Sequence, residues 1–299
     1  MIKNILVPLD GSEHAEGALP YALAIASAAG ARVLLVTAVQ QLGVWDVTIS
    51  LQVMEREELL AQAYLDEKVK SLKDGNEVEA RLVRGTAAEA VLDAAKAATA
   101  DLIAMSTHGR SGITRWLFGS VADRVLHSSE TPLLIVRPDE DGKPKKAPAI
   151  KKILVPLDGS PIAESVLPFV EDLAKTLGAS LVLFHAIAPI TAYPGFEYAP
   201  PVSGELLESM QEQAREVVRR SAEEVQSRGV KAEGAVCIDQ PVDGILQAAT
   251  DMGCQLIAIG THGRSRLGRM VLGSVADGVV RRSHLPCLVI HSREVRSLE

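Results

Sequence analysis

The stretch IKNILVPLDGS at residues 2–12 returns as IKKILVPLDGS at residues 150–160. Further along, STHGRSGITRWLFGSVAD at residues 106–123 returns as GTHGRSRLGRMVLGSVAD at residues 260–277. A repeat of this length is too long for a solenoid unit and fits a whole domain, so the sequence predicts a tandem duplication. We expect one domain at residues 1–138, a second at residues 150–299 and, at residues 139–149, a linker rich in proline and charge.

Each opening stretch predicts a strand followed by a helix. ILVPL at residues 5–9 and again at 153–157 is a short apolar run, typical of a strand buried on both faces of a parallel sheet. Asp-Gly-Ser follows, and then a helical pattern in which Ser160 is a natural N-cap and Pro161 the first helical residue. Strands and helices keep alternating, which predicts an α/β fold of two tandem doubly wound open sheets flanked by helices. We expect the later strands at residues 33–39, 80–85, 101–106, 132–138, 181–187, 234–238, 255–260 and 286–292.

Two features of the predicted helices concern their packing. The long helical segments at residues 54–72 and 207–225 carry apolar stripes, and we expect Leu59 and Leu60 to face the core. Pro20 and Pro168 stand at matching positions two turns into the first helix of each half, where an interior proline costs about 3 kcal/mol. The helix is therefore expected to be kinked there or to start later.

The composition narrows the class of protein. The 299 residues are 47% hydrophobic and 23% charged, which is typical of a globular chain, and the net charge of −7 with no long basic run argues against a nucleic-acid or anionic-membrane surface. No apolar run reaches the length of a membrane span or a signal-peptide core, so we expect a cytoplasmic protein. Cys237, Cys254 and Cys287 lack a CxxC spacing and are expected to be reduced, and the histidines show no metal-binding spacing.

The loop after the fourth strand has the spacing of a phosphate site. In the second half it runs Gly260-Thr-His-Gly263, then nine residues, then Gly273-Ser274 and a helix. Glycines let backbone N–H groups approach a phosphate closely, a helix start adds unpaired N–H groups, and Arg264 would add charge. The simpler interpretation is that the glycines turn the chain and Ser274 caps a helix. The spaced set lies where the strand order is expected to reverse and is almost repeated in the other half, which favours the phosphate site.

A carboxylate follows the first strand of each half. Pro8-Leu9-Asp10 and Pro156-Leu157-Asp158 place it where a ribose hydroxyl or a base nitrogen would meet it. A turn-forming Asp-Gly is the alternative.

The tandem LVPLDGS openings together with the Gly-x2-Gly-x9-Gly-Ser loop resemble the universal stress protein family, in the two-domain form of its ATP-binding branch. The resemblance covers nearly the whole chain apart from the linker. It implies five parallel strands per domain in the order 3-2-1-4-5, and ATP, with Mg²⁺, as the bound nucleotide. It also implies that fifth strands pair edge to edge, so the two halves would form a pseudo-dimer within the chain. A further homodimer of the whole chain is left open.

Carried over position by position, the resemblance gives two sets of nucleotide-binding residues. In the second half they are Pro156, Leu157, Asp158, Ala186, Gly260, Gly263, Arg264, Gly273, Ser274 and Val275. In the first half they are Pro8, Leu9, Asp10, Ala38, Ser106, Gly109, Gly119, Ser120 and Val121. Ser106 departs from the family's first glycine, and its side chain would either clash with the nucleotide or donate a hydrogen bond to it. We therefore expect the second half to be the stronger site.

Three functions fit these observations. The first is a regulatory protein whose ATP-bound state is read by partners. The second is a slow ATPase or phosphotransferase, against which stand the absence of a GxxxxGK[ST] motif and the lack of a clear partner for the loop histidines His108 and His262. The third is an interaction protein without nucleotide. The first is favoured, with no catalytic residue and no protein metal site expected.

Overall fold

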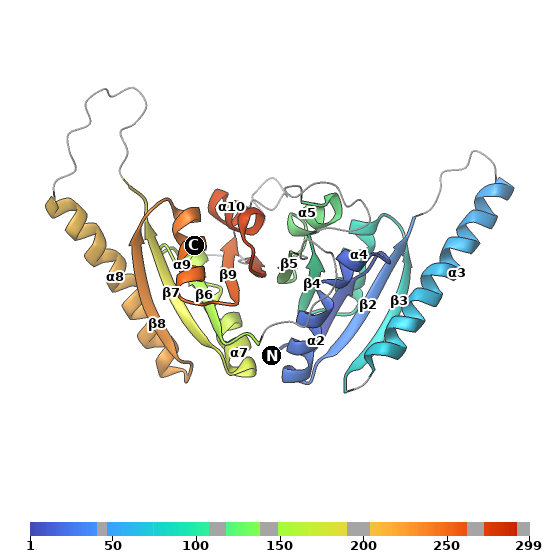
Figure 1. Ribbon diagram of the computed structural model, residues 1–299, viewed down its shortest axis with the longest axis horizontal. Coiled ribbons are helices and arrows are strands. Elements are labelled where there is room, and N and C mark those ends of the chain that lie inside the picture. Colours follow the sequence, from blue (N-terminus) through green and yellow to red (C-terminus); the bar gives the residue numbers. More distant parts are fainter. Residues whose placement is uncertain are drawn as a thin grey trace, which may run out of the picture.

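The computed structural model describes residues 1–40, 47–73, 75–107, 118–137, 149–189, 204–261 and 272–291. Strands and helices alternate through both halves (Figure 1). The first half contains β1 (Asn4–Pro8), α1 (Glu13–Glu16), α2 (Leu19–Ala29), β2 (Arg32–Val39), α3 (Val47–Leu72), β3 (Glu77–Arg84), α4 (Ala87–Ala97), β4 (Leu102–Ser106), α5 (Ser120–Leu126) and β5 (Leu133–Val136). The second half contains β6 (Lys152–Pro156), α6 (Pro161–Glu164), α7 (Leu167–Leu177), β7 (Ser180–Ile187), α8 (Gly204–Ser227), β8 (Ala232–Ile238), α9 (Pro241–Asp251), β9 (Leu256–Thr261), α10 (Ser274–Arg282) and β10 (Cys287–His291).

The strands of the described residues form one sheet in the order β3-β2-β1-β4-β5-β10-β9-β6-β7-β8. Within each half the pairing is parallel, and the order 3-2-1-4-5 is confirmed. The halves join where β5 pairs antiparallel with β10, with Leu134 opposite Leu288. The predicted edge-to-edge pairing of the fifth strands is therefore confirmed, and neither apolar fifth strand is left as an open edge.

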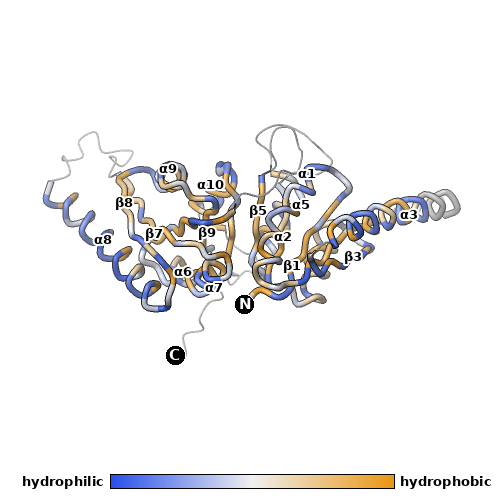
Figure 2. The backbone as a smooth tube through the Cα atoms, turned by 60° about the horizontal axis from the view of Figure 1, so that its bottom comes forward, coloured by the Kyte–Doolittle hydropathy of each residue, from blue (hydrophilic) through white to orange (hydrophobic). Residues whose placement is uncertain are grey.

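Helices cover both faces of the sheet. One core cluster packs α1, α2, α6 and α7, with residues of α3 and α8, against one face, and a second packs α4, α5, α9 and α10 against the other. The central strands are buried on both faces and consist largely of hydrophobic residues, whereas α8 carries many hydrophilic ones (Figure 2). The described residues contain no helix long and apolar enough to cross a membrane.

The first helix of each half is broken before its proline. α1 ends at Glu16 and α6 at Glu164, and new helices then start with Pro20 and Pro168 in their first turn. Proline is tolerated there because the first N–H groups of a helix have no intrahelical partner. The predicted disturbance at the prolines is thus a break into two helices rather than a kink or a late start, while the Ser160 cap and the position of Pro161 are confirmed.

The expected orientation of Leu59 and Leu60 is wrong. Their exposed fractions are 72% and 63%, whereas Leu65 is completely buried. α3 lies at the outer edge of the molecule and meets the sheet with only one side, which carries Leu65, Val69 and Leu72 (Figure 1).

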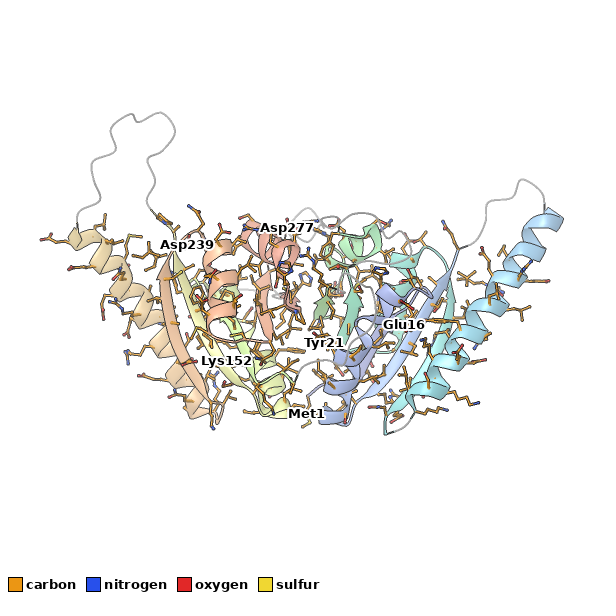
Figure 3. All side chains as sticks on the ribbon, in the orientation of Figure 1. Met1, Glu16, Tyr21, Lys152, Asp239 and Asp277 are labelled. Atoms are coloured by element: carbon orange, nitrogen blue, oxygen red, sulfur yellow. The ribbon has the colours of Figure 1, made fainter. Side chains whose placement is uncertain are left out.

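Among the described residues, each half buries one carboxylate, and each of the two is paired. Glu16 accepts a hydrogen bond from the Tyr64 hydroxyl at 2.8 Å and an ion pair from Lys68 Nζ at 2.7 Å, joining α1 to α3. Glu16 is labelled in Figure 3. In the second half, Glu171 of α7 pairs with Arg228 at 2.7 Å.

The predicted linker lies almost wholly outside the described residues, so the division into domains stays a prediction.

Candidate functional site

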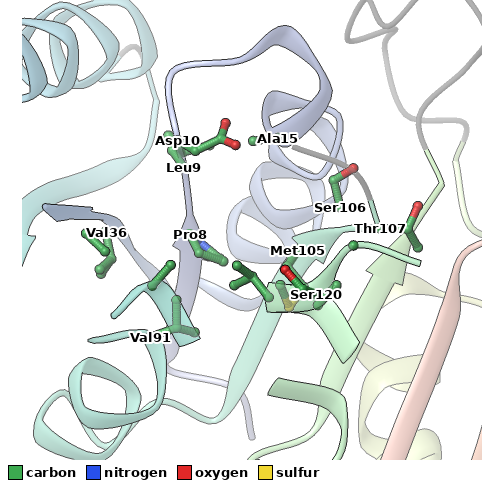
Figure 4. Close-up of a pocket in the computed structure, with 15 residues that line it drawn as sticks. Pro8, Leu9, Asp10, Ala15, Val36, Val91, Met105, Ser106, Thr107 and Ser120 are labelled. Carbon is green, nitrogen blue, oxygen red and sulfur yellow. The ribbon is translucent and has the colours of Figure 1, made fainter. Parts of the chain in front are cut away.

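A cavity of about 280 Å³ lies at the carboxyl ends of β1 and β4 in the first half (Figure 4). β1 pairs with β2 on one side and β4 on the other, so the strand order reverses between β1 and β4. Crossover helices then diverge to opposite faces and leave a crevice, which is where ligands bind in open α/β sheets.

The structure brings together all the predicted first-half residues except Gly109, which lies outside the described residues. The cavity is lined by Pro8, Leu9, Asp10, Ala15, Val36, Ala38, Ala87, Val91, Met105, Ser106, Thr107, Gly119, Ser120, Val121 and Ala122. Their contact with a nucleotide stays a prediction.

The cavity has a polar side and an apolar side. In Figure 4, Asp10, Ser106 and Thr107 lie on one side, and Val36 and Val91 lie on the other. Such a division suits a ligand with a flat apolar part and a hydroxyl- or phosphate-bearing part.

Asp10 is held by the turn that follows β1. Its Oδ1 accepts hydrogen bonds from the Ser12 N–H at 3.0 Å and from the Ser12 hydroxyl at 2.6 Å. Gly11 has φ 83°, a conformation that favours glycine, and Ser12 Oγ in turn caps α1 by accepting from the Ala15 N–H. Among the described lining residues, Asp10 is the only one with a charged side chain.

Gly119 is required by a close approach of two backbones. Its N–H donates to the Thr107 carbonyl at 2.8 Å, and a Cβ at residue 119 would lie 2.8 Å from the same oxygen. Gly119 is also the N-cap of α5 and, having no side chain, makes no side-chain cap to the first N–H groups of the helix.

The second half repeats the frame of this site. Pro156 ends β6, Leu157 is buried, and Asp158 Oδ1 accepts from the Ser160 N–H at 2.9 Å. Ala186 lies in β7 and Gly260 in β9, while Gly273 caps α10, which begins with Ser274 and Val275. Gly263, Arg264, His108 and His262 lie outside the described residues.

The apolar walls of the cavity are formed largely by Val36, Val91 and Met105, none of which was predicted as a site residue from the sequence. These residues have the composition of an ordinary core, and by themselves they carry no signal. The parallel register supplies one, because Val36 lies opposite Pro8 at the carboxyl end of β1.

The described residues hold no group of three or more His, Cys, Asp or Glu side chains that could bind a metal ion. The three cysteines are unpaired, and burial raises the pKa of Cys254 to about 11 and that of Cys287 to about 12. Their thiols are therefore uncharged at neutral pH and poorly reactive.

The fold and the cavity define a tandem doubly wound α/β protein with a ligand crevice at the point of strand reversal. The sequence model of the universal stress protein family matches residues 1–137 and 149–291. The chain belongs to the universal stress protein family.

Relatives support this assignment along the whole chain. A universal stress protein of Mycolicibacterium smegmatis is 26% identical over 301 aligned residues, covering 97% of each chain. One from Mycobacterium tuberculosis is 29% identical over 192 residues, 64% of this chain, and the match spans 61% of that relative's length.

Among solved structures, a universal stress protein from Archaeoglobus fulgidus has a TM-score of 0.69 at 20% identity, covering 96% of this chain and 98% of the other. One from Pseudomonas aeruginosa has a TM-score of 0.68 at 17% identity, covering 97% and 93%. At this identity the likeness shows the fold alone.

Proposed function

We propose that this chain is an ATP-binding regulatory protein of the stress response, whose nucleotide-bound state is read by partner proteins. The observation that carries the proposal is the cavity at the carboxyl ends of β1 and β4, lined by an apolar wall, one carboxylate and a helix start. Its volume of about 280 Å³ is close to the roughly 300 Å³ at which small-molecule sites begin, so it suits the base and ribose, with the phosphates toward the start of α5.

The lining residues fit an adenine nucleotide. Val36, Ala38 and Val91 supply the flat apolar wall that a base needs. Asp10 places a carboxylate in the cavity, and a ribose hydroxyl is a suitable donor to a carboxylate. The N–H groups of the first turn of α5, which Gly119 cannot cap with a side chain, suit phosphate oxygens, and Mg²⁺, when bound, would neutralise phosphate charge.

The proposal covers location and assembly as well. Three unpaired cysteines suit a reducing compartment, so we place the protein in the cytoplasm. The β5–β10 pairing supplies the fifth-strand contact within one chain, and a homodimer of whole chains would need another surface.

The test is to denature freshly purified protein and identify any released nucleotide by chromatography and mass spectrometry. The proposal expects an adenine nucleotide, saturable rebinding of Mg-ATP to emptied protein, and no phosphate release above a protein-free blank. Steady phosphate release that Asp10→Ala abolishes would instead favour the ATPase. Protein that is empty and does not bind added Mg-ATP would favour the interaction protein without nucleotide.

A further inference from the structure

The two halves differ at the floor of the base pocket. Val36 lies opposite Pro8 in the β1–β2 ladder, and Phe184 lies opposite Pro156 in the β6–β7 ladder. Residues at the same register position of equivalent strands face the same side of the sheet, so Phe184 faces the volume that corresponds to the cavity beside Val36. A phenyl ring therefore stands in the second half where the first half has an isopropyl group.

This ring is packed into the core of the second half. Phe184 is 2% exposed and belongs to the same buried cluster as Ile245 and Ile259. Those residues stand at the positions of Val91 and Met105, which line the first-half cavity. Val36, Val91 and Met105 are buried as well, so the halves differ at these positions in side-chain volume and not in burial.

The helix beside the pocket carries a smaller residue in the second half. α4 and α9 are both eleven residues long, and their fourth residues are Ala90 and Gly244. A Cβ at residue 244 would lie 2.8 Å from Cys237 Sγ and 3.5 Å from the Ala186 Cβ. There is thus no room for that methyl group where α9 packs against Cys237 and Ala186.

Ser106 of the first half stands where the second half has Gly260, and the neighbouring helix of the first half carries a smaller residue. A Cβ at Gly260 would lie 2.9 Å from the Ile162 carbonyl oxygen and 2.9 Å from Val166 Cγ1. Val166 is the N-cap residue of α7. The N-cap of α2, at the same position of the first half, is Ala18. The first half thus combines the larger Ser106 with the smaller Ala18, and the second half combines the smaller Gly260 with the larger Val166. By this correspondence the Cβ of residue 106 is directed toward the helices.

We infer that the chain has one nucleotide site, in the first half, and that Phe184 with the close packing of α9 closes the base pocket of the second. This inference rests on the proposed function. The glycine loops alone had predicted that the second half is the stronger site, and this inference reverses that expectation. The second half is then a structural partner whose base pocket holds no base.

The test is equilibrium dialysis of the full-length protein, emptied of nucleotide, against radiolabelled Mg-ATP. The inference expects one ATP per chain for the wild type. Val36→Phe, which puts the larger ring into the first pocket, should weaken binding by more than about tenfold, since overpacking a base pocket removes the room for the ligand. Phe184→Val, the reciprocal change, should add a second, weaker site. Melting curves check that both variants fold.

The outcomes separate the two proposals. One ATP per chain, lost in folded Val36→Phe, supports the inference. Two per chain in the wild type, or one that survives Val36→Phe and disappears with a change in the second half, overturns it and leaves ATP binding standing. No binding by the wild type overturns the proposed function and the inference together. The wild-type count decides even if a variant does not fold.

Discussion

At the scale of single residues, Asp10 is the polar anchor of the site. Asp10→Asn retains the oxygen that accepts from Ser12 and removes the negative charge offered to the ribose. We expect ATP affinity to fall by about tenfold, because a hydrogen bond to a charged group contributes roughly 1.5–3 kcal/mol. Titration calorimetry measures the loss. Asp101→Asn is the matched control, since Asp101 holds the backbone of Lys3 and Asn4 at the opposite end of β1 and should leave affinity unchanged.

The exchange between Ser106 and Ala18 gives a second residue-scale prediction. Ala18 is fully buried, and Ala18→Val should destabilise the protein by about 1–3 kcal/mol through overpacking. Adding Ser106→Gly should restore much of this loss, because the pair then matches Gly260 and Val166. A double-mutant cycle from urea unfolding measures the coupling. Additive effects would show that the two positions do not share one space.

Some residues of the site could be predicted from the sequence, and others could not. The turn residues around Asp10 and Gly119 could be predicted because glycine, serine and aspartate have strong local preferences. The walls Val36 and Val91 could not, because a pocket wall and a core have the same composition. The match of Ser106 with Ala18 joins residues far apart in the sequence, and only the packing of α2 on β4 reveals it.

At the scale of elements, α1 is a short helix of four residues held by its contact with α3. Glu16→Ala removes the acceptor of Tyr64 and Lys68 and leaves a half-buried ammonium without its partner. We expect a loss of about 1–3 kcal/mol in unfolding free energy. Glu164→Ala is the control, because Glu164 pairs with the exposed Arg220 and such a pair contributes less than about 1 kcal/mol. Equal losses in both variants would contradict this account.

Element positions were largely predictable, and helix orientation was not. Strand β7 was expected at residues 181–187 and spans Ser180–Ile187, because an apolar run ending at polar residues is a local signal. Leu59 and Leu60 were assigned to the wrong side of α3 because a helix at the edge of a sheet buries a narrow stripe. Which residues form that stripe depends on where the helix lies, and this is set by the sheet.

At the scale of the whole molecule, the two halves meet around β5 and β10. Arg281 of α10 pairs with Asp123 of α5 at 2.7 Å, and Arg137 donates to the Arg281 carbonyl oxygen. His291, at the end of β10, contacts Thr261 Oγ1 through Nδ1 at 2.6 Å. The helices that begin at the two glycine loops thus end at the junction of the halves.

His291 makes this junction sensitive to acid. Burial, and next the nearby His127, lower the pKa of His291 to about 4, below its ordinary 6.5. The unfolded chain then binds more protons as the pH falls from about 6.5 toward 4, so His291 should reduce stability by roughly 1–2 kcal/mol between pH 7 and pH 5. His291→Asn should lose that part of the pH dependence in urea unfolding, whereas His284→Asn, at an exposed position, should keep it. Parallel curves for the wild type and His291→Asn would exclude this role.

The central claim is that one nucleotide binds, in the first half of this universal stress protein. Photolabelling of the unmodified wild-type protein with 8-azido-ATP, followed by mass spectrometry of its peptides, tests it most directly. We predict saturable labelling, competed by ATP, on peptides of the first half that contain β2, α4 or the end of β4. Labelling of the matching peptides around β7, α9 and β9, to the same extent or instead, would contradict the claim.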